Sequence, residues 1–395
     1  MHMLKKQFAC FLAALIVLQI FVFTIQAAPS SAELKLNSEA ALLIDAENET
    51  VLYEKNAHKK MAPASLTKLM ILLLAMEDLE AGRVDQDSTV TISERAWRTG
   101  ADESQMFLNA GQHVSFKELI DGIAVVSAND ACIAVAEHLN GSVEVFVQRM
   151  NSRAAELGLK NSHFANVHGL DDPAHHMSAA DVAHLTSYLI RSHPEALAIS
   201  SKKELTFNEI LQFNYNTLLG KYPGTDGMKT GNTPKAGYCL ASTAEQQGMR
   251  LIGVTMHADT KGKRHNDSVA LLDYGFCNYE LKTLYEEGKV VTTIPVKRGQ
   301  KKEAALVSPD PVRAVVPRNN KSYKITEELD LPRSLNAPVE KGDVVGTLRL
   351  KDARGKTITE VELKAKESLS RLGFFPHIWR QAGDLFSGLW KRIRR

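Results

Sequence analysis

The chain has 395 residues, of which 44% are hydrophobic and 24% charged, and its formal net charge is +2 at pH 7. This composition excludes a mainly disordered, collagen-like or disulfide-scaffold protein. The length predicts two or three domains, and a net charge so close to zero gives no reason to expect a nucleic-acid partner.

The first 27 residues have the pattern of a secretory signal peptide. Lys5 and Lys6 precede the apolar run 8–22, and Ala27 is a small residue at a suitable place for cleavage. We therefore expect an exported protein at the outer face of the cytoplasmic membrane or in the cell wall. An uncleaved N-terminal anchor is the alternative, and it would also place the body outside the cytoplasm.

Residues 34–277 predict a single α+β domain, because helical patterns are enclosed between N-terminal and C-terminal strands. Residues 39–55 predict a β-hairpin, and Leu66 to Glu80 predict a long helix. Further helices are expected over 116–126, 131–139, 143–158 and 178–191, then strands over 237–243 and 249–257, and a last helix over 267–276.

Two further units follow this domain. Residues 285–366 contain short Val, Ile and Leu runs divided by Pro, Gly and Asn, which predicts a small all-β domain. Residues 371–395 have apolar side chains at helical spacing and a net charge of +5 from Lys and Arg. This predicts an amphipathic helix that lies on a membrane surface; the alternative is a helix packed on the body.

Three short motifs carry the candidate chemistry, namely Ser65-Leu66-Thr67-Lys68, Ser127-Ala128-Asn129 and Lys229-Thr230-Gly231. Each pattern is weak alone, since Ser200 to Lys203 and Ser334 to Asn336 match the first two as well. Context favours Ser65, which opens an apolar helix with Lys68 one turn later, about 5–6 Å away between Cβ atoms. An amine at that position can activate the hydroxyl as a nucleophile.

The other two motifs provide groups that a peptide substrate needs. Ser127 and Asn129 lie where two helices break, so the hydroxyl can relay a proton and the amide can hold a peptide backbone. Lys229 and Thr230 can bind a carboxylate, and Gly231 permits a close backbone approach. The following strand, 238–243, is expected to offer its edge to an extended peptide. Taken singly, these residues also fit a helix cap, a turn and a solvated charge.

Together the motifs resemble those of the penicillin-recognising serine acyl-enzymes. The longer strings 63–68, 168–172, 226–231 and 236–238 resemble the low-molecular-mass D-alanyl-D-alanine carboxypeptidases, near the bacillus sporulation type. The resemblance implies a transpeptidase-like domain with an antiparallel sheet and helices, a small β-domain and an amphipathic anchor. It implies a substrate of peptidoglycan stem pentapeptide, covalent inhibition by β-lactams, and no metal or organic cofactor.

The resemblance also implies a role for each matching residue. Ser65 is the expected nucleophile, Lys68 its general base, and Ser127 the group that passes a proton to the departing D-alanine. The expected substrate-binding residues are Asn129, Lys229, Thr230, Gly231 and Arg264. The backbone N–H groups of Ser65 and Asn232 are expected to form the oxyanion hole. Asn232 departs from the pattern, because several relatives have His there.

Three alternatives compete with this hypothesis. A class A β-lactamase uses a glutamate and a water for deacylation, but the closest acidic string here, Glu137-His138-Leu139-Asn140, has the wrong spacing and follows Ser127 too closely. An inactive wall-binding scaffold would be expected to have lost Ser65, Lys68 or Lys229, and all three are present. A metal hydrolase would need a ligand spacing such as HExxH, and the sequence has none. His175 is therefore interpreted as an ordering residue of its loop.

Overall fold

The computed structural model describes residues 34–372, apart from 101–103, 319, 321 and 353–354. The predicted signal peptide lies outside the described residues, and so does the predicted amphipathic helix beyond Leu372. Within the described part of the chain, no helix is long and apolar enough to cross a membrane.

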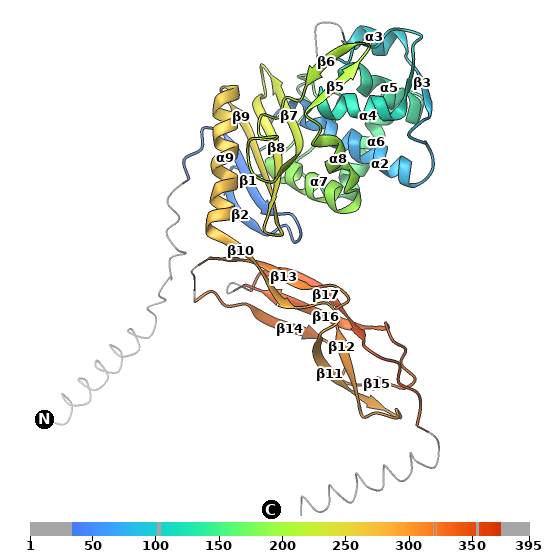
Figure 1. Cartoon of the computed structure of the whole chain (residues 1–395), viewed down its shortest axis with the longest axis vertical. Coiled ribbons are helices and arrows are strands. Elements are labelled where there is room, and N and C mark those ends of the chain that lie inside the picture. Colours follow the sequence, from blue (N-terminus) through green and yellow to red (C-terminus); the bar gives the residue numbers. More distant parts are fainter. Residues whose placement is uncertain (1–33, 101–103, 319, 321, 353–354, 373–395) are drawn as a thin grey trace, which may run out of the picture. The chain divides into compact units, whose positions relative to one another are not determined.

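The α+β domain is built on a five-stranded antiparallel sheet with the order β2-β1-β9-β8-β7 (Figure 1). Its strands are β1 (Ala40–Asp45), β2 (Val51–Lys55), β7 (Thr225–Thr233), β8 (Gly237–Gln246) and β9 (Met249–Ala258). The predicted hairpin and the two predicted strands after residue 236 are confirmed. Because β1 pairs with β9, the two ends of the domain meet in the middle of one sheet.

The two faces of this sheet pack on different helices, as the two-residue period of a strand requires. Leu43 and Leu251 approach Gly275 of α9 (Lys261–Asn278), where a Cβ would lie 2.4 Å from Leu251 Cδ1. Leu42 and Val254 point instead into the core shared with the other helices. The helix α9 starts before the predicted position 267, because the Thr260 side chain caps it by accepting a hydrogen bond from the Lys263 N–H.

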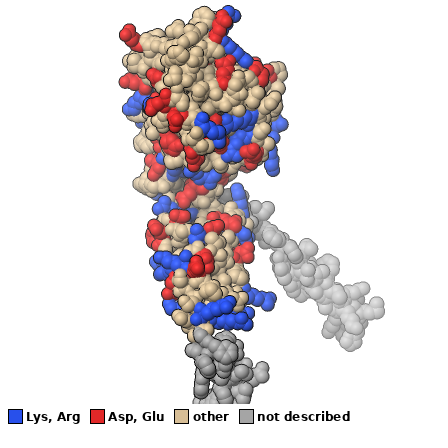
Figure 2. Space-filling view, turned by 90° about the vertical axis from the view of Figure 1, so that its right-hand side faces the viewer, with Lys and Arg blue, Asp and Glu red and all other residues tan. Residues whose placement is uncertain are grey.

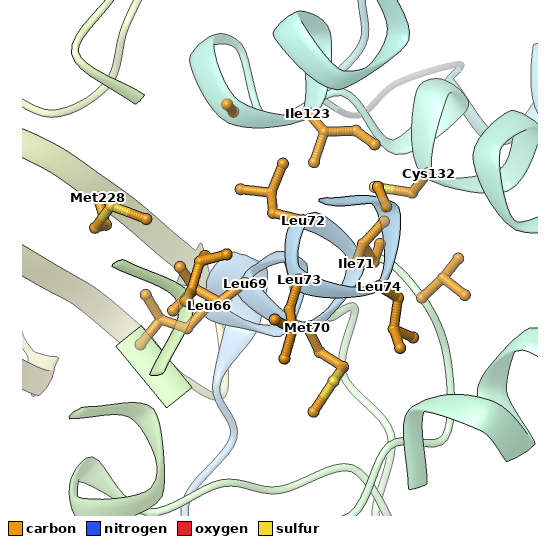
Figure 3. Close-up of a cluster of buried hydrophobic side chains, with 14 of the residues drawn as sticks. Leu66, Leu69, Met70, Ile71, Leu72, Leu73, Leu74, Ile123, Cys132 and Met228 are labelled. Carbon is orange, nitrogen blue, oxygen red and sulfur yellow. The ribbon is translucent and has the colours of Figure 1, made fainter. Parts of the chain in front are cut away.

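The second face is covered by helices that surround α2 (Lys68–Glu80), as Figure 3 shows. Ten of its thirteen residues are buried, and a helix that is apolar on all sides belongs in a core. Its neighbours are α4 (Phe116–Val125), α5 (Asn129–Asn140), α6 (Val143–Glu156) and α7 (Ala179–Ser192). The core therefore fixes the N-terminal end of α2, where Lys68 lies and which Ser65 closely precedes.

Several short elements of this domain had no sequence pattern that predicted them. They are α3 (Glu94–Gly100), α8 (Glu195–Ser200), the hairpin of β3 (Thr89–Thr91) with β4 (His113–Ser115), and the hairpin of β5 (Glu204–Phe207) with β6 (Ile210–Phe213). Strands of three or four residues are too short to show a clear alternation.

The C-terminal domain is all-β, as predicted, and its strands begin at Tyr279 instead of 285. They are β10 (Tyr279–Tyr285), β11 (Val290–Lys297), β12 (Glu303–Val307), β13 (Val312–Pro317), β14 (Thr326–Asp330), β15 (Leu335–Asn336), β16 (Val344–Lys351) and β17 (Thr357–Ala365). Six form a sheet with the order β14-β16-β17-β12-β11-β15, and β10 pairs with β13. This domain has an apolar core of its own, which includes Leu306, Leu348 and Leu363.

Candidate active site

Ser65 lies in a single 3-10 turn, η1 (Ala64–Thr67), that leads directly into α2. The helix predicted to start at Ser65 therefore begins with a tighter turn, and Lys68 is the first residue of the α-helix proper. The side chain of Thr67 braces the turn, since its Oγ1 donates a hydrogen bond to Ala64 O at 2.7 Å. Ser65 itself is only partly buried, so its hydroxyl is open to a substrate.

Lys68 is fully buried, and its Nζ contacts three oxygen atoms at 2.8 Å each: Ser65 Oγ, Asn129 Oδ1 and the backbone O of His168. The last two oxygens can only accept hydrogen bonds. A neutral amine has two N–H groups and one lone pair, so in that form the lone pair faces the Ser65 hydroxyl. This is the arrangement that a general base requires.

Ser127 and Asn129 lie at the junction of α4 and α5, as the sequence predicted. Ser127 has a φ of 60°, and its buried Oγ has no hydrogen-bond partner among the described residues. Asn129 is held on both sides: its N–H donates to Ser104 O at 2.7 Å, and its side-chain oxygen contacts Lys68. A buried hydroxyl without a partner costs free energy, so Ser127 is suited to bond a ligand.

Lys229, Thr230 and Gly231 lie within β7, at the edge of the sheet beside the turn that contains Ser65. The sequence predicted that the strand 238–243 would offer its edge to a peptide, and this prediction is wrong. That segment is part of β8, which pairs with β7 on one side and β9 on the other. The edge that faces outward therefore belongs to β7.

Lys229 and Arg264 are buried cations, with 2% and 3% of their surface exposed. Among the described residues, Lys229 Nζ contacts only Thr230 O, and Arg264 Nη2 contacts Tyr215 O while its Nε has no partner. Burial lowers the pKa of Lys229 well below its ordinary value, and the charges of Lys68 and Arg264 lower it further. Buried cations without a carboxylate are costly, so this part of the site is suited to an anionic group.

Asn232, the remaining predicted site residue, is exposed on β7 directly after Gly231 and opposite Tyr238. The second copies of the motifs lie elsewhere. Ser200 is the last residue of α8, and Ser334 precedes β15 in the C-terminal domain. Among the matching residues, Ser65, Lys68 and Asn129 are connected in one site by the hydrogen bonds of Lys68 Nζ.

One loop, 166–172, connects three parts of this site. His168 O accepts from Lys68, and Gly169 (φ 91°) lies so near the nucleophile turn that a Cβ there would be 1.9 Å from Ala64 O. Asp171 accepts hydrogen bonds from Thr233 Oγ1 at 2.6 Å and Lys235 N at 3.1 Å, which anchors the end of β7. The His-Gly-Leu-Asp string was noticed in the sequence, but its partners become evident only in the fold.

His175 supports the nucleophile turn from behind. Its Nε2 lies 2.8 Å from Thr67 Oγ1, whose own proton goes to Ala64 O, so His175 is the donor. Its Nδ1 accepts from Ala165 N at 3.2 Å. Both nitrogens are thus used by a neutral ring, and burial lowers the pKa of His175 to about 4. The sequence indicated an ordering role in its own loop, and this residue also orders the turn 64–67 that contains Ser65.

The chain is similar to known proteins over most of its length. Residues 25–260 match the family model described as D-alanyl-D-alanine carboxypeptidase, and residues 279–371 match the C-terminal domain of penicillin-binding protein 5. The D-alanyl-D-alanine carboxypeptidase DacF of Bacillus subtilis is 36% identical over 92% of this chain and 93% of its own. DacC of Escherichia coli is 40% identical over 87% of each chain.

Solved structures show the same similarity. Penicillin-binding protein 5 of Haemophilus influenzae is 37% identical with a TM-score of 0.75, over 85% of this chain and 98% of that chain. Penicillin-binding protein D2 of Listeria monocytogenes, solved in an ampicillin-bound form, is 33% identical with a TM-score of 0.56. The similarity covers 61% of this chain and 98% of the Listeria chain.

Proposed function

Because the chain belongs to the D-alanyl-D-alanine carboxypeptidase family of serine peptidases, we propose that it removes the terminal D-alanine from peptidoglycan stem peptides through an acyl-enzyme on Ser65. The observation that carries this proposal is the position of Lys68 Nζ, which lies 2.8 Å from Ser65 Oγ while two acceptor oxygens take its other hydrogen bonds. A base so placed activates a serine without a metal or an organic cofactor.

In the first half of the reaction, Ser65 Oγ attacks the carbonyl carbon of the penultimate D-alanine, and its proton passes to Lys68. The backbone N–H groups of Ser65 and Asn232 bind the oxyanion of the tetrahedral intermediate. The C–N bond then breaks, and the leaving amine takes a proton from Ser127 Oγ, which Lys68 restores. The unpartnered Oγ of Ser127 supports this relay. Water hydrolyses the ester in the second half and frees Ser65.

Lys229, Thr230 and Arg264 hold the terminal carboxylate of the substrate. Two buried cations without a carboxylate partner among the described residues support this assignment. The extended peptide pairs with the free edge of β7. Because Gly231 has no side chain, the peptide on this strand can lie close to the turn that contains Ser65. Asn129 orients the peptide backbone. A β-lactam carries a carboxylate and a reactive carbonyl too, so it acylates Ser65 and leaves slowly.

The test is release of D-alanine from a peptide ending in D-Ala-D-Ala, with the Ser65→Ala variant and with Ser200→Ala as a matched control from the second SxxK string. We expect Ser65→Ala to abolish both release and covalent labelling by penicillin, and Ser200→Ala to retain them. Release that survives in Ser65→Ala would overturn the assignment. Rapid turnover of penicillin without D-alanine release would indicate a β-lactamase, and inactivity in both assays a non-catalytic scaffold.

We also propose a location and a domain organisation. Residues 1–27 act as a signal peptide, 34–277 as the catalytic domain, 285–366 as the β-rich domain, and 371–395 as an amphipathic helix on the outer face of the cytoplasmic membrane. The basic and aromatic residues of the last segment support a membrane surface as its partner. There the enzyme limits cross-linking during wall maturation, including that of spores. Deleting 373–395 should greatly weaken the binding of the protein to membranes.

A further inference from the structure

One end of the C-terminal domain is made of three loops that hydrogen-bond to one another. Ala337 N donates to Lys297 O, Gln300 N donates to Ser370 O, and Leu372 N donates to Arg298 O at 2.8 Å. Val339 and Leu369 also exchange both of their backbone hydrogen bonds. The loops 297–302, 336–343 and 366–372 therefore form one surface, from which the chain continues into residues 373–395.

This surface, here named the basic end, is rich in exposed Lys and Arg side chains. They are Lys297, Arg298, Lys301, Lys302, Lys341, Lys366 and Arg371. Four acidic residues accompany them, namely Glu303, Glu340, Asp343 and Glu367. The other charged residues described between 279 and 372 balance, with ten basic and ten acidic. All of the excess positive charge of the described domain thus lies at this end, and Figure 2 shows basic side chains gathered there, at its lower end.

We propose that the basic end lies against an anionic lipid surface and forms a second membrane contact, separate from the amphipathic segment. The inference rests on the proposed membrane location. Its support is continuity of charge: the segment 373–395 carries a further net charge of +4 and begins directly at the basic end. A bilayer that receives this segment is therefore held near the basic end of the domain.

Charge complementarity gives the contact its energy. Each Lys or Arg within a Debye length of an anionic membrane adds a favourable electrostatic contribution. A single weak anchor binds a membrane reversibly, whereas an anchor combined with a polybasic surface binds stably. The backbone hydrogen bonds among the three loops hold the charges in place, so no ordering of a flexible segment is required on binding.

The experiment measures binding of residues 28–395, which include every described residue, to vesicles. One set contains phosphatidylglycerol and phosphatidylcholine, and the other contains phosphatidylcholine alone. The test variant replaces Lys297, Arg298, Lys341 and Lys366 by Gln. The matched control replaces Lys282, Lys289, Lys324 and Lys356 by Gln; these residues are exposed and lie away from the loops of the basic end, and the change in net charge is the same.

We expect the test variant to lose at least about tenfold in affinity for the anionic vesicles at 0.1 M salt, with a flatter salt dependence. The control variant should keep most of its affinity, and both should bind neutral vesicles as the unaltered protein does. Equal losses in the two variants, or no loss in either, would overturn the proposal. So would a test variant that keeps its affinity for vesicles but loses binding to an isolated anionic wall polymer.

Two further readouts separate this proposal from those above. D-alanine release should be the same in both variants and in the unaltered protein, because the substitutions lie in the C-terminal domain and not in the site. A chain that ends at Leu372 should retain weak, salt-sensitive binding to anionic vesicles. If it binds as tightly as 28–395, the membrane role of 373–395 fails and the basic end is the main contact; if it does not bind at all, the basic end makes no contact of its own.

Discussion

Gly231 of β7 lies directly against the backbone of Ser65: a Cβ at Gly231 would be 3.0 Å from Ser65 N and 3.0 Å from Ala64 Cβ. The absence of a side chain at Gly231 therefore sets how closely β7, with Lys229 and Thr230, approaches the turn 64–67.

The Gly231→Ala variant should push the nucleophile turn away from β7. A displacement well below 1 Å is enough to slow acylation by about ten- to a hundredfold. The rate of covalent labelling by a fluorescent penicillin measures this effect. Gly262→Ala is the control, because a Cβ there would meet only Thr260 Oγ1, at 3.9 Å. Equal rates in the two variants would show that the contact has no catalytic importance.

Asn129→Asp tests whether Lys68 acts as a neutral base. The new carboxylate would lie 2.8 Å from Lys68 Nζ and would stabilise its ammonium form, which has no lone pair. We expect labelling at pH 7 to slow by about a hundredfold, with a rate that rises more steeply with pH than that of the unaltered protein. Asn109→Asp adds the same charge at an exposed position and should leave the rate unchanged. An unchanged rate in Asn129→Asp would contradict the role of Lys68.

Gly169 and Gly82 form a matched pair, because both have a positive φ but only one is crowded. A Cβ on Gly169 would lie 1.9 Å from Ala64 O, and one on Gly82 would meet nothing within 4 Å. Gly82→Ala should lower the free energy of unfolding by about 1 kcal/mol, and Gly169→Ala by about 3 kcal/mol or more. Urea denaturation measures both values. Similar losses in the two variants would mean that the loop 166–172 can move to accommodate the new side chain at no expense in free energy.

The lowered pKa of the buried His175 leads us to expect that the protein loses stability in acid. Its folded-state pKa of about 4 lies below its ordinary value of 6.5, so the unfolded chain binds more protons between these values. This contribution to the free energy of unfolding is therefore present above pH 6.5 and is lost as the pH falls toward 4. His175→Gln should remove up to roughly 3 kcal/mol of that pH dependence. Parallel curves for the two proteins in denaturant titrations between pH 4 and 7 would refute it.

The parts of the fold that sequence predicted well are those that apolar pattern alone determines. The hairpin at 39–55, the buried α2 and the all-β C-terminal domain depend on burial of Val, Ile and Leu, which leaves a period or a run in the sequence. The first two motifs lie where the sequence predicted them, at the start of α2 and at the break before α5, whereas the third lies inside β7, a strand that the sequence did not predict.

The site was harder to predict where function overrides pattern. Strand β7 has the sequence Thr-Asp-Gly-Met-Lys-Thr-Gly-Asn-Thr, and five consecutive residues of it are buried. Lys229 and Thr230 are buried there although they are polar, beside Gly231, which packs on the turn 64–67, so neither alternation nor apolar character marks the strand. For the same reason sequence analysis assigned the free edge to the more apolar β8.

The contacts of His168, Gly169 and His175 escaped prediction for a different reason. Their partners, Lys68, Ala64 and Thr67, are about a hundred residues away along the chain, and loop residues carry no periodic signal that relates them. Only the folded chain brings the backbone oxygen of His168 to the catalytic lysine.

The position of α2 has a consequence for how this protein can change. The segment that presents Ser65 and Lys68 leads directly into a helix buried in the core of the domain (Figure 3). A substitution that shifts Ser65 enough to evade a β-lactam must therefore disturb the packing that holds the domain together. Tolerance to mutation is expected instead at the exposed surroundings of the site, such as Asn232, where an altered side chain can discriminate between substrate and drug without loss of the native state.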